Sequence, residues 1–265
     1  MSECGNCPVH NKDNLIKLGI NMNQFDFLVA LAGNPNTGKS TVFNNLTGLK
    51  QHTGNWPGKT VTRAEGGYSY NQKRFKLVDL PGTYSLLSTS VDEEVARDFV
   101  LFGQPDVTVI VVDATRLERN LNLVLQINEI TERSVLCLNL MDEASRYEHE
   151  IDVRSLSKDL GIPVVPTEAR QKKGMDKLLE AVYDVASGNF ICKPHKVVSV
   201  PSKIKKILED LTDKITNEFP NLPNPRWVAM RLLEGDQKIL DSIRSGELNT
   251  IIKTQEIETT ENIPV

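Results

Sequence analysis

The chain has 265 residues, of which 39% are hydrophobic and 25% charged, a composition typical of a globular protein with a sizeable core. Its formal net charge of -4 argues against a nucleic-acid-binding surface, so no nucleic-acid partner is expected. The sequence contains no apolar run of about 18 residues, no secretory signal and only four cysteines, so a protein of the reducing cytosol is expected.

The first 24 residues are polar and, apart from residues 14–20, show no periodicity, which predicts a flexible N-terminal tail over residues 1–24. This tail contains Cys4, Cys7 and His10. The spacing of the two cysteines is typical of metal ligands, and His10 would be a third ligand. A complete site needs a further ligand pair, which does not follow nearby. Metal binding and a reduced tail without metal therefore both remain open.

Residues 33–40 predict a phosphate-binding P-loop, because they match G-x-x-x-x-G-K-[ST] at every fixed position. The apolar run 27–32 predicts a buried strand before the loop, and residues 40–46 predict a helix after it. A strand, a glycine-rich turn and a helix in this order direct backbone N–H groups toward one point, which suits a polyphosphate. The residues expected to bind it are Gly33, Asn34, Pro35, Asn36, Thr37, Gly38, Lys39, Ser40 and Thr41.

Lys39 and Ser40 have separate roles in such a loop. Lys39 would bind the β- and γ-phosphates, and the Ser40 hydroxyl would bind Mg²⁺. The alternative is a glycine-rich loop that only turns the chain. The complete motif and its correct flanks favour the nucleotide.

From Phe27 onward, apolar runs alternate with amphipathic stretches. Strands are predicted at 107–112, 135–138 and 162–165, with a hairpin formed by 68–70 and 76–79. Helices are predicted at 92–102, 118–132, 152–160 and 175–187. This alternation predicts an α/β fold with a mostly parallel sheet, covered by helices on both faces. Ligands of such sheets bind beyond the carboxyl ends of the strands.

Near Gly188 the composition changes. Beyond it the apolar residues recur at helical spacing, as do Ile204, Ile207, Leu208, Leu211 and Ile215. This spacing predicts a small all-helical domain packed on the first. The predicted organisation is a tail over residues 1–24, a nucleotide-binding domain over 25–188 and a helical domain over 189–265.

A second motif, Asp-Leu-Pro-Gly at residues 79–82, closes a predicted strand, as D-x-x-G does in GTPases. Asp79 would contact Mg²⁺ through water, and the Gly82 N–H would sense the γ-phosphate. Between this motif and the P-loop lies a glycine-rich segment that we call switch I, made of Gly54, Asn55, Trp56, Pro57, Gly58, Lys59 and Thr60. Thr60 would bind Mg²⁺ only when the γ-phosphate is present. The alternative is an ordinary turn before a strand.

The base of the nucleotide is expected to be read by residues 139–142, Asn-Leu-Met-Asp, which follow a predicted strand. The Asp142 carboxylate can accept from both N1–H and the exocyclic amine of guanine, a pair of donors that adenine lacks. Sites of this kind discriminate by roughly 10⁴-fold. The alternative is an aspartate that caps a helix. Leu140 stands where a lysine is usual.

A loop at residues 167–169 is expected to lie behind the base, with the Ala169 N–H on guanine O6. The alternative is an ordinary loop after a strand. Glu168 departs from the small residue that is usual there. The residues expected at the base are thus Asn139, Met141, Asp142, Thr167, Glu168 and Ala169.

The residues expected to take part in catalysis are Lys39, Thr60, Gly82 and Asn36. Thr83 and Tyr84 follow Gly82, so the glutamine that positions water in many GTPases is missing, and no arginine is evidently placed as a finger. These features predict a slow GTPase whose nucleotide state reshapes residues 50–60 and 83–95.

The motifs G-N-P-N-T-G-K-S, G-N-W-P-G-K-T-V, D-L-P-G-T-Y-S-L and N-L-M-D, followed by a helical domain, resemble the cytoplasmic part of FeoB, the bacterial ferrous iron transport protein B, over about residues 25–262. The resemblance implies a Ras-like P-loop GTPase that converts GTP to GDP and phosphate. It also implies Mg²⁺, and a K⁺ ion held by Asn36 and by switch I carbonyls around Gly54 and Trp56.

The same resemblance implies that the chain is a soluble portion at the cytoplasmic face of the bacterial cell inner membrane. Its partners would be guanine nucleotide and the membrane-embedded remainder of the transporter, with a homo-oligomer left open. Two other functions also remain open. One is a ribosome- or tRNA-associated GTPase, and the other is a nucleotide-gated interaction module in which hydrolysis is incidental.

Overall fold

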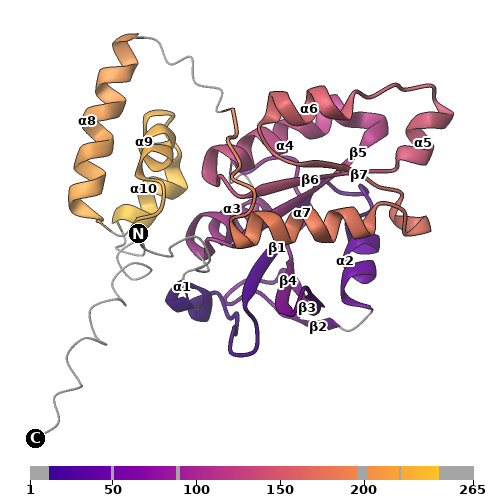
Figure 1. Cartoon of the computed structure of the whole chain (residues 1–265). Coiled ribbons are helices and arrows are strands. Elements are labelled where there is room, and N and C mark those ends of the chain that lie inside the picture. The colour runs from indigo at the N-terminus through magenta and orange to yellow at the C-terminus, as the bar shows by residue number, and fades with distance from the viewer. Residues whose placement is uncertain (1–11, 49–50, 88–89, 196–201, 221, 245–265) are drawn as a thin grey trace, which may run out of the picture.

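The computed structural model describes residues 12–48, 51–87, 90–195, 202–220 and 222–244. In these residues an α/β domain is followed by a group of helices (Figure 1). The α/β domain contains a sheet of seven strands, which are β1 (Phe27–Gly33), β2 (Gln51–Asn55), β3 (Thr62–Tyr70), β4 (Lys73–Asp79), β5 (Val107–Asp113), β6 (Ser134–Asn139) and β7 (Val164–Pro166).

The strands lie in the order β2-β3-β4-β1-β5-β6-β7. Neighbouring strands from β4 to β7 run parallel, whereas β3 is antiparallel to both β4 and β2. Parallel strands place their carboxyl ends at one edge of the sheet, which is where ligands bind in this architecture. Gly33, Asp79, Asp113 and Asn139 are the last residues of β1, β4, β5 and β6, so the predicted motifs converge at this edge.

Helices cover both faces of the sheet. In the α/β domain they are α1 (Lys12–Lys17), α2 (Lys39–Thr47), α3 (Val91–Gly103), α4 (Leu117–Ile130), α5 (Met141–Arg146), α6 (Val153–Leu160) and α7 (Met175–Ser187), with short 3₁₀ turns at Ala114–Arg116 and Ala169–Gln171. α2 and α7 lie on one face, and α3 and α4 lie on the other (Figure 1). This arrangement confirms the predicted fold class.

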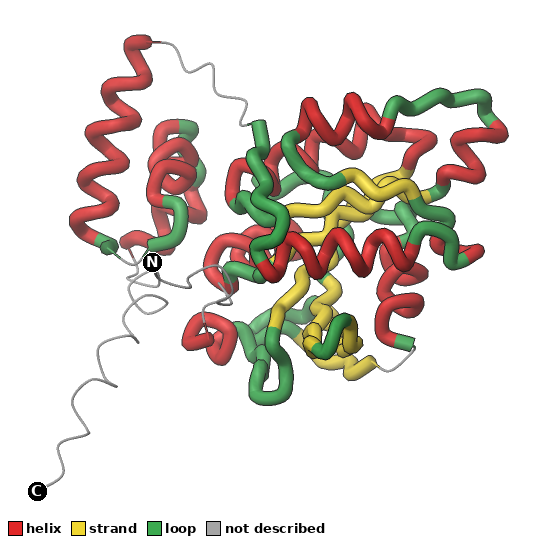
Figure 2. Tube along the Cα trace, viewed as in Figure 1, coloured by secondary structure: helices red, strands yellow, loops and turns green. Residues whose placement is uncertain are grey.

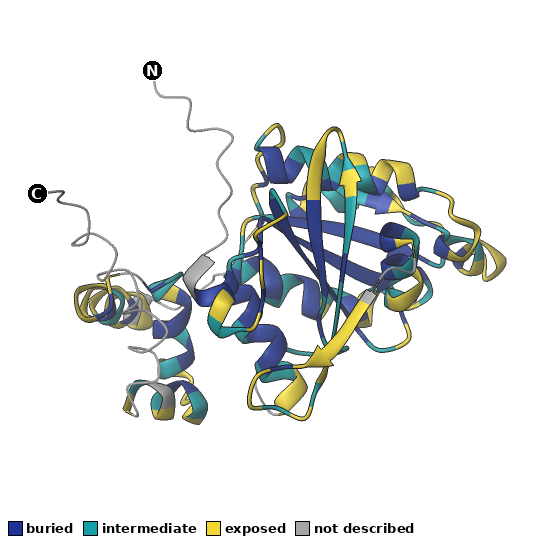
Figure 3. Ribbon diagram, turned by 90° about the horizontal axis from the view of Figure 1, so that it is seen from below, coloured by how far each residue is buried: buried dark blue, intermediate teal, exposed yellow. Residues whose placement is uncertain are grey.

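The core lies between the sheet and its two helical layers (Figure 3). All seven residues of β1 and the first six of β5 are buried, which explains why both strands are continuous apolar runs without alternation. The β3–β4 hairpin closes through Asn71 and Gln72, both with positive φ (46 and 63), as a tight hairpin turn requires. The turn is therefore shorter than residues 71–75, which the predicted strands 68–70 and 76–79 leave between them.

The N-terminal segment differs from the predicted flexible tail. Residues 12–24 begin with helix α1, and Leu15 and Ile20 from this segment are fully buried. The Asn14 side-chain amide donates to the Phe102 carbonyl at 3.0 Å, which ties the segment to the end of α3. The apolar spacing in residues 14–20 therefore marks a packed element. Residues 1–11, with Cys4, Cys7 and His10, lie outside the described residues.

In the described residues after 201, the regular elements are all helices (Figure 2), namely α8 (Ser202–Glu218), α9 (Pro225–Leu233) and α10 (Gln237–Arg244). Leu208, Ile215 and Trp227 are buried among these helices, whereas Ile204 and Ile207 are exposed, so only part of the predicted stripe is core. The predicted domain limits at residues 24 and 188 stay predictions.

Asn224 joins this helical group to the α/β domain. Its side-chain oxygen caps the start of α9 by accepting from Trp227 N–H at 3.1 Å. Its side-chain amide donates to the carbonyls of Glu129 and Ile130, at 2.8 and 3.1 Å, where α4 ends. One side chain therefore satisfies the open ends of two helices from different parts of the chain. Across the described residues, no helix has the length and apolar character needed to span a bilayer.

Candidate nucleotide-binding site

The P-loop connects the carboxyl end of β1 to the start of α2, as the sequence predicts. Gly38 has φ 84, and a Cβ there would collide with the Asn139 side-chain amide, so only glycine fits. Asn36 has φ 66, in the left-handed region that asparagine tolerates better than most residues. These two turns present the N–H groups at the start of α2 toward a common point, an arrangement that binds phosphate.

Lys39 of the P-loop forms an ion pair with Asp79 of the second motif. The Lys39 ammonium also donates to the Leu80 carbonyl at 2.7 Å. Burial raises the pKa of the Asp79 carboxyl, and the nearby Lys39 charge opposes this rise. Because phosphate oxygens compete with Asp79 for the same ammonium, a bound polyphosphate would release the carboxylate to act on another cation.

The residues after Asp79 lie directly against the P-loop. The Thr83 N–H donates to the Gly33 carbonyl at 3.3 Å. A Cβ on Gly82 would lie 3.4 Å from the Pro35 nitrogen, an ordinary van der Waals contact, so Gly82 lies directly beside the loop backbone. This close approach is what a γ-phosphate sensor after the D-x-x-G motif needs.

Asn139 connects the P-loop to the loop at residues 167–169. Its side-chain amide donates to the Thr37 carbonyl at 3.0 Å. Its side-chain oxygen accepts from the Ala169 N–H at 3.0 Å and from the Thr167 hydroxyl at 3.2 Å. Asn139 is almost completely buried, and three of the four hydrogen-bonding positions of its side chain are used by these two loops. The side chain therefore fixes the base region relative to the phosphate region.

Asp142 lies in the first turn of α5 and is only partly buried. Gln171 Nε2 lies 3.4 Å from one carboxylate oxygen, a long contact that leaves most of its accepting capacity for a ligand. The preceding Leu140 has φ 63, a conformation that costs a leucine roughly 1–3 kcal/mol and is found at binding sites more than elsewhere. This turn sets the direction in which α5 starts, and with it the position of Asp142.

The Glu168 carboxylate is engaged by a lysine of its own turn. Its carboxylate pairs with Lys173 at 2.8 Å, and its backbone N–H donates to the Lys173 carbonyl at 3.1 Å. The neighbouring Ala169 carbonyl accepts from the Asn45 side-chain amide of α2 at 2.6 Å. The unusual acidic residue is thus partly neutralised by its own turn.

A cavity of about 370 Å³ opens beside the P-loop, between residues 34–38 and a wall that includes Tyr84, Leu140 and Glu143. Asn34 lines this cavity with a buried side chain. Within the part of the chain that the structure describes, neither polar atom of the Asn34 side chain has a hydrogen-bond partner. Buried polar groups without partners are uncommon in native proteins, and ligands or ordered water usually satisfy them. The cavity is therefore a polar site prepared for an occupant.

Two arginines at this cavity were not anticipated from the sequence. Arg116 and Arg119 both line it, and the Arg119 guanidinium lies 4.5 Å from the centroid of the Tyr84 ring. This stacking joins α4 to the residues that follow the D-x-x-G motif. The signal that points to them is their position just after β5, because the carboxyl ends of parallel strands surround the ligand.

Switch I follows the P-loop in the sequence. In the structure it begins at the end of β2, the outermost strand of the sheet. β2 pairs with β3, and the turn after it is closed by Trp56 N–H on the Val61 carbonyl and Lys59 N–H on the Trp56 carbonyl, both at 3.0 Å. Trp56 is buried, with its ring 5.4 Å from that of Phe99 of α3. Lys59 is partly buried. The other residues of the segment are exposed, namely Gly54, Asn55, Pro57, Gly58 and Thr60.

Arg63 fastens this position of switch I to the N-terminal segment. Its guanidinium lies over the Trp56 ring at 5.3 Å. The same group donates to the Leu18 carbonyl at 2.7 Å and to the Gly19 carbonyl at 3.1 Å. The N-terminal segment therefore helps to keep Trp56 buried.

The structure thus brings together three of the four predicted elements. The P-loop, the D-x-x-G motif and the base-side residues meet at the carboxyl edge of the sheet. The exposed Thr60 lies in the β2–β3 turn, and β3 and β4 separate β2 from β1 in the sheet. Joining Thr60 to the metal site requires switch I to leave this position.

Comparison with known sequences gives two matches along the chain. The family model "Ferrous iron transport protein B" matches residues 27–182, and the model "FeoB cytosolic helical domain" matches residues 201–263. The chain is 40% identical over 212 residues to the Fe(2+) transporter FeoB of Salmonella typhimurium and 38% identical over 212 residues to that of Escherichia coli K12. These alignments cover 78% of this chain and 27% of each relative, so the chain spans about a quarter of their length.

Solved structures match over a larger share of their own length. The cytosolic domain of T. maritima FeoB in GDP form I is 36% identical, with a TM-score of 0.74 and coverage of 85% of both chains. The cytosolic domain of L. pneumophila FeoB is 34% identical, with a TM-score of 0.74 and coverage of 87% of this chain and 90% of that one. The α/β domain is accordingly a G domain, a fold that binds guanine nucleotide. The chain belongs to the ferrous iron transport protein B family.

Proposed function

We propose that this chain binds GTP, hydrolyses it slowly to GDP and phosphate, and thereby regulates a bacterial membrane transporter of Fe²⁺. The observation that carries the proposal is the convergence of the P-loop, the D-x-x-G motif and the base-reading segment around Asn139 and Lys39. Guanine would be read by Asp142 and by the Ala169 N–H. Family membership favours this function over a ribosome- or tRNA-associated GTPase.

The oxygen ligands at the phosphate site suit Mg²⁺. The Ser40 hydroxyl follows Lys39 at the start of α2, and the partly buried Asp79 carboxylate pairs with the same lysine. Hydroxyl and carboxylate oxygens are the hard ligands that Mg²⁺ prefers, alongside phosphate and water. Bound Mg²⁺ would supply charge neutralisation at the phosphates. Thr60 would complete this set after switch I has moved.

Hydrolysis in this site depends on positioning and electrostatics, because no glutamine follows Gly82. Lys39 holds the terminal phosphates, the Gly82 N–H faces the γ-phosphate, and Thr60 orders switch I. Asn36 lies exposed at the cavity, where its side-chain oxygen is free to join phosphate and carbonyl oxygens around K⁺. The Trp56 carbonyl accepts from Lys59 in the position seen here, so the K⁺ site also requires switch I to rearrange.

The remainder of the transporter would lie in the membrane, and this chain would act at its cytoplasmic face. The curated relatives are named Fe(2+) transporters and are about four times longer than the matched region, which is 27% of their length. The domain described here would then convert the nucleotide state into a signal for that remainder. The second candidate function is a nucleotide-gated interaction module, in which hydrolysis is incidental.

A titration of labelled GDP, GTP and ATP into the purified chain tests the proposal, with turnover measured in the same samples. We expect binding of both guanine nucleotides, at least about 100-fold weaker binding of ATP, and slow phosphate release. Equal affinity for ATP and GTP would contradict the assignment of the base site. Tight GTP binding without any turnover would favour the second candidate.

Hydrolysis is expected to be at least about tenfold faster in K⁺ than in Na⁺ at equal ionic strength, equivalent to about 1.4 kcal/mol of the barrier. The larger ion fits a site of amide, carbonyl and phosphate oxygens beside Asn36. Single-turnover phosphate release in matched KCl and NaCl measures the difference. Asn36→Ala should remove it while Mg²⁺-GDP binding survives.

The backbone of Asn36 provides a matched control for this experiment. Its φ of 66 strains alanine but not glycine, so Asn36→Gly removes the amide without the strain. If both variants lose the K⁺ effect, the amide is responsible. Equal rates of the unmodified chain in the two salts would end the K⁺ proposal.

Thr60→Ala is expected to leave GDP affinity unchanged and to slow hydrolysis by at least about tenfold, because Thr60 acts only when the γ-phosphate is present. GDP titration and single-turnover hydrolysis measure the two effects. Thr62→Ala, at an exposed position two residues further on, is the control. An equal loss of affinity for GDP and GTP would show instead that the substitution disturbs the fold.

A further inference from the structure

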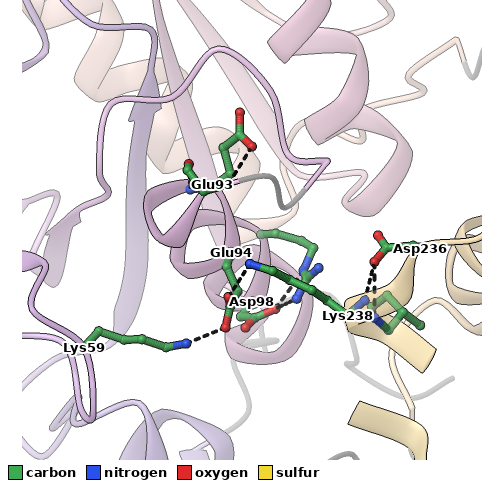
Figure 4. A network of polar contacts seen from close by, with 9 residues as sticks. Lys59, Glu93, Glu94, Asp98, Asp236 and Lys238 are labelled. Carbon is green, nitrogen blue, oxygen red and sulfur yellow. Dashed lines mark hydrogen bonds and ion pairs between the residues drawn. The ribbon is translucent and has the colours of Figure 1, made fainter. Parts of the chain in front are cut away.

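One carboxylate, that of Glu94, contacts two lysines from distant parts of the chain (Figure 4). Glu94 lies in the first turn of α3. One of its oxygens pairs with Lys59 of switch I, and the other pairs with Lys238 of α10 at 2.8 Å. Lys59 is the residue immediately before Thr60. Switch I, α3 and the helical domain therefore meet at a single side chain.

The positions of Glu94 and Lys238 are fixed by the caps of their helices. Ser90 and Glu93 form a capping box at the start of α3, so the Glu93 side chain is used there and Glu94 is left for the lysines. At the start of α10, Asp236 accepts from the Lys238 N–H at 3.1 Å. The two capped helix ends thus fix the positions of the Glu94 carboxylate and the Lys238 ammonium relative to their helices.

Both ion pairs are partly shielded from water. The side chain of Glu94 is 21% exposed, and those of Lys59 and Lys238 are 34% and 40% exposed. Burial would raise the pKa of Glu94, but hydrogen bonds from Lys238 and Lys59 outweigh this, so its pKa lies below the ordinary value. Glu94 is therefore ionised at neutral pH.

Two cations that share one carboxylate weaken each other. Each ammonium lowers the negative potential that attracts the other, and the two ammonium groups repel. Coupling between sites is reciprocal, so whatever removes Lys59 from Glu94 strengthens the contact of Lys238, and the reverse also holds.

We propose that Glu94 links switch I to the helical domain through this competition, an inference that rests on the proposed GTPase function. The Glu94–Lys59 pair stabilises the position in which Trp56 is buried and Thr60 is exposed. Lys238 weakens that pair and so favours release of switch I. When Thr60 moves to the nucleotide, Lys59 leaves with it, and Glu94 binds Lys238 more strongly. The nucleotide state thereby changes the strength of the contact between Glu94 and Lys238 of α10.

Four proteins test this link, namely the unmodified chain, Lys238→Met, Glu94→Gln and the double variant. Amide hydrogen exchange of residues 51–61 measures the release of switch I. Single-turnover phosphate release measures the GTP hydrolysis that depends on this release. Lys238→Met should slow both by about two- to fivefold, the size expected for partly exposed ion pairs. Glu94→Gln should accelerate exchange, and adding Lys238→Met to it should change nothing further.

The same set of proteins separates the link from other effects. Lys205→Met, at an exposed position of α8 whose lysine lies 4.0 Å from Glu209 of the same helix, should leave both readouts unchanged. An unchanged or faster exchange in Lys238→Met, or an equal effect of Lys238→Met with and without Glu94, would overturn the proposal. If Glu94→Gln fails to fold, Lys59→Met takes its place, with the same expectation.

Exchange measured without nucleotide keeps this test independent of the proposed function. The ion pairs exist in the chain alone, so their effect on residues 51–61 does not require GTP. Failure of the chain to bind GTP would therefore contradict the proposed function. The exchange result would still decide whether Glu94 links switch I to the helical domain.

Discussion

Lys39→Ala is expected to weaken the binding of both GTP and GDP by at least about 100-fold, or roughly 2.8 kcal/mol. Lys39 is the only mobile cation that the P-loop supplies to the phosphates, and charge-assisted hydrogen bonds to phosphate are among the strongest in proteins. The loop amides remain in the variant, so binding is weakened at the phosphates and not at the base. Titration with labelled GTP and GDP measures the loss.

The control for this experiment is Lys177→Ala, which removes an exposed lysine of α7. Its nucleotide affinity should equal that of the unmodified chain. Near-normal GTP affinity in Lys39→Ala would remove the P-loop assignment, since Lys39 supplies the side-chain charge that the motif directs at the phosphates.

Loss of Lys39 also leaves the partly buried Asp79 carboxylate without its counter-charge. The pKa of Asp79 is already raised by burial, and removal of Lys39 raises it further. A carboxyl whose folded pKa is raised disfavours folding once it is ionised, so this cost is absent at low pH and appears as the pH rises through the folded pKa. Lys39→Ala should therefore lose more of its thermal stability at neutral pH than at mildly acidic pH.

Asp142→Asn is expected to reduce GTP affinity by roughly 100-fold or more and to leave weak ATP binding nearly unchanged, so that the preference for guanine collapses. A carboxylate accepts from N1–H and from the exocyclic amine together, whereas an amide offers one acceptor and one donor. The structure leaves Asp142 free for this role, since its nearest donor, Gln171, is 3.4 Å away. Competition of GTP and ATP against labelled GDP measures the ratio.

Xanthosine triphosphate makes this test more specific. Its base carries a carbonyl where guanine carries the amine, so the amide of Asn at position 142 can donate to it. The variant should therefore bind xanthosine triphosphate better than GTP. Asp210→Asn, at an exposed position of α8, is the control and should keep the guanine preference. Unchanged discrimination in Asp142→Asn would mean that another residue reads the base.

Contiguous motifs could be recognised from the sequence because their geometry is local. The P-loop needs only a strand, two permissive backbone positions and a helix, all within residues 27–47. The role of Asn139 was harder to foresee, because its partners, Thr37 and Ala169, are set by the order of strands and not by spacing along the chain. The motif at residues 139–142 identified Asn139 as a site residue. Its contacts with two loops follow from the sheet topology, which brings these loops together.

Other features depend on contacts that no sequence pattern reveals. Trp56 stands in a glycine-rich exposed segment, yet its ring is buried against Phe99, which is more than forty residues away along the chain. Arg119 has no motif of its own and gains its place from Tyr84. The short helix α1 spans only six residues, too few to show a clear helical period, and Ile20 and Met22, which are also buried, lie beyond its end.

The chain contains two tryptophans, Trp56 and Trp227, and the fold assigns one to each domain. Trp56 is 3% exposed beneath Arg63, and Trp227 is 4% exposed in α9, with Arg231 5.7 Å from its ring. The tryptophan emission of the protein therefore comes from one indole in switch I and one in the helical domain. Replacing either indole with phenylalanine leaves a single unlabelled reporter, so two single-tryptophan variants would report on switch I and on the helical domain separately and in real time.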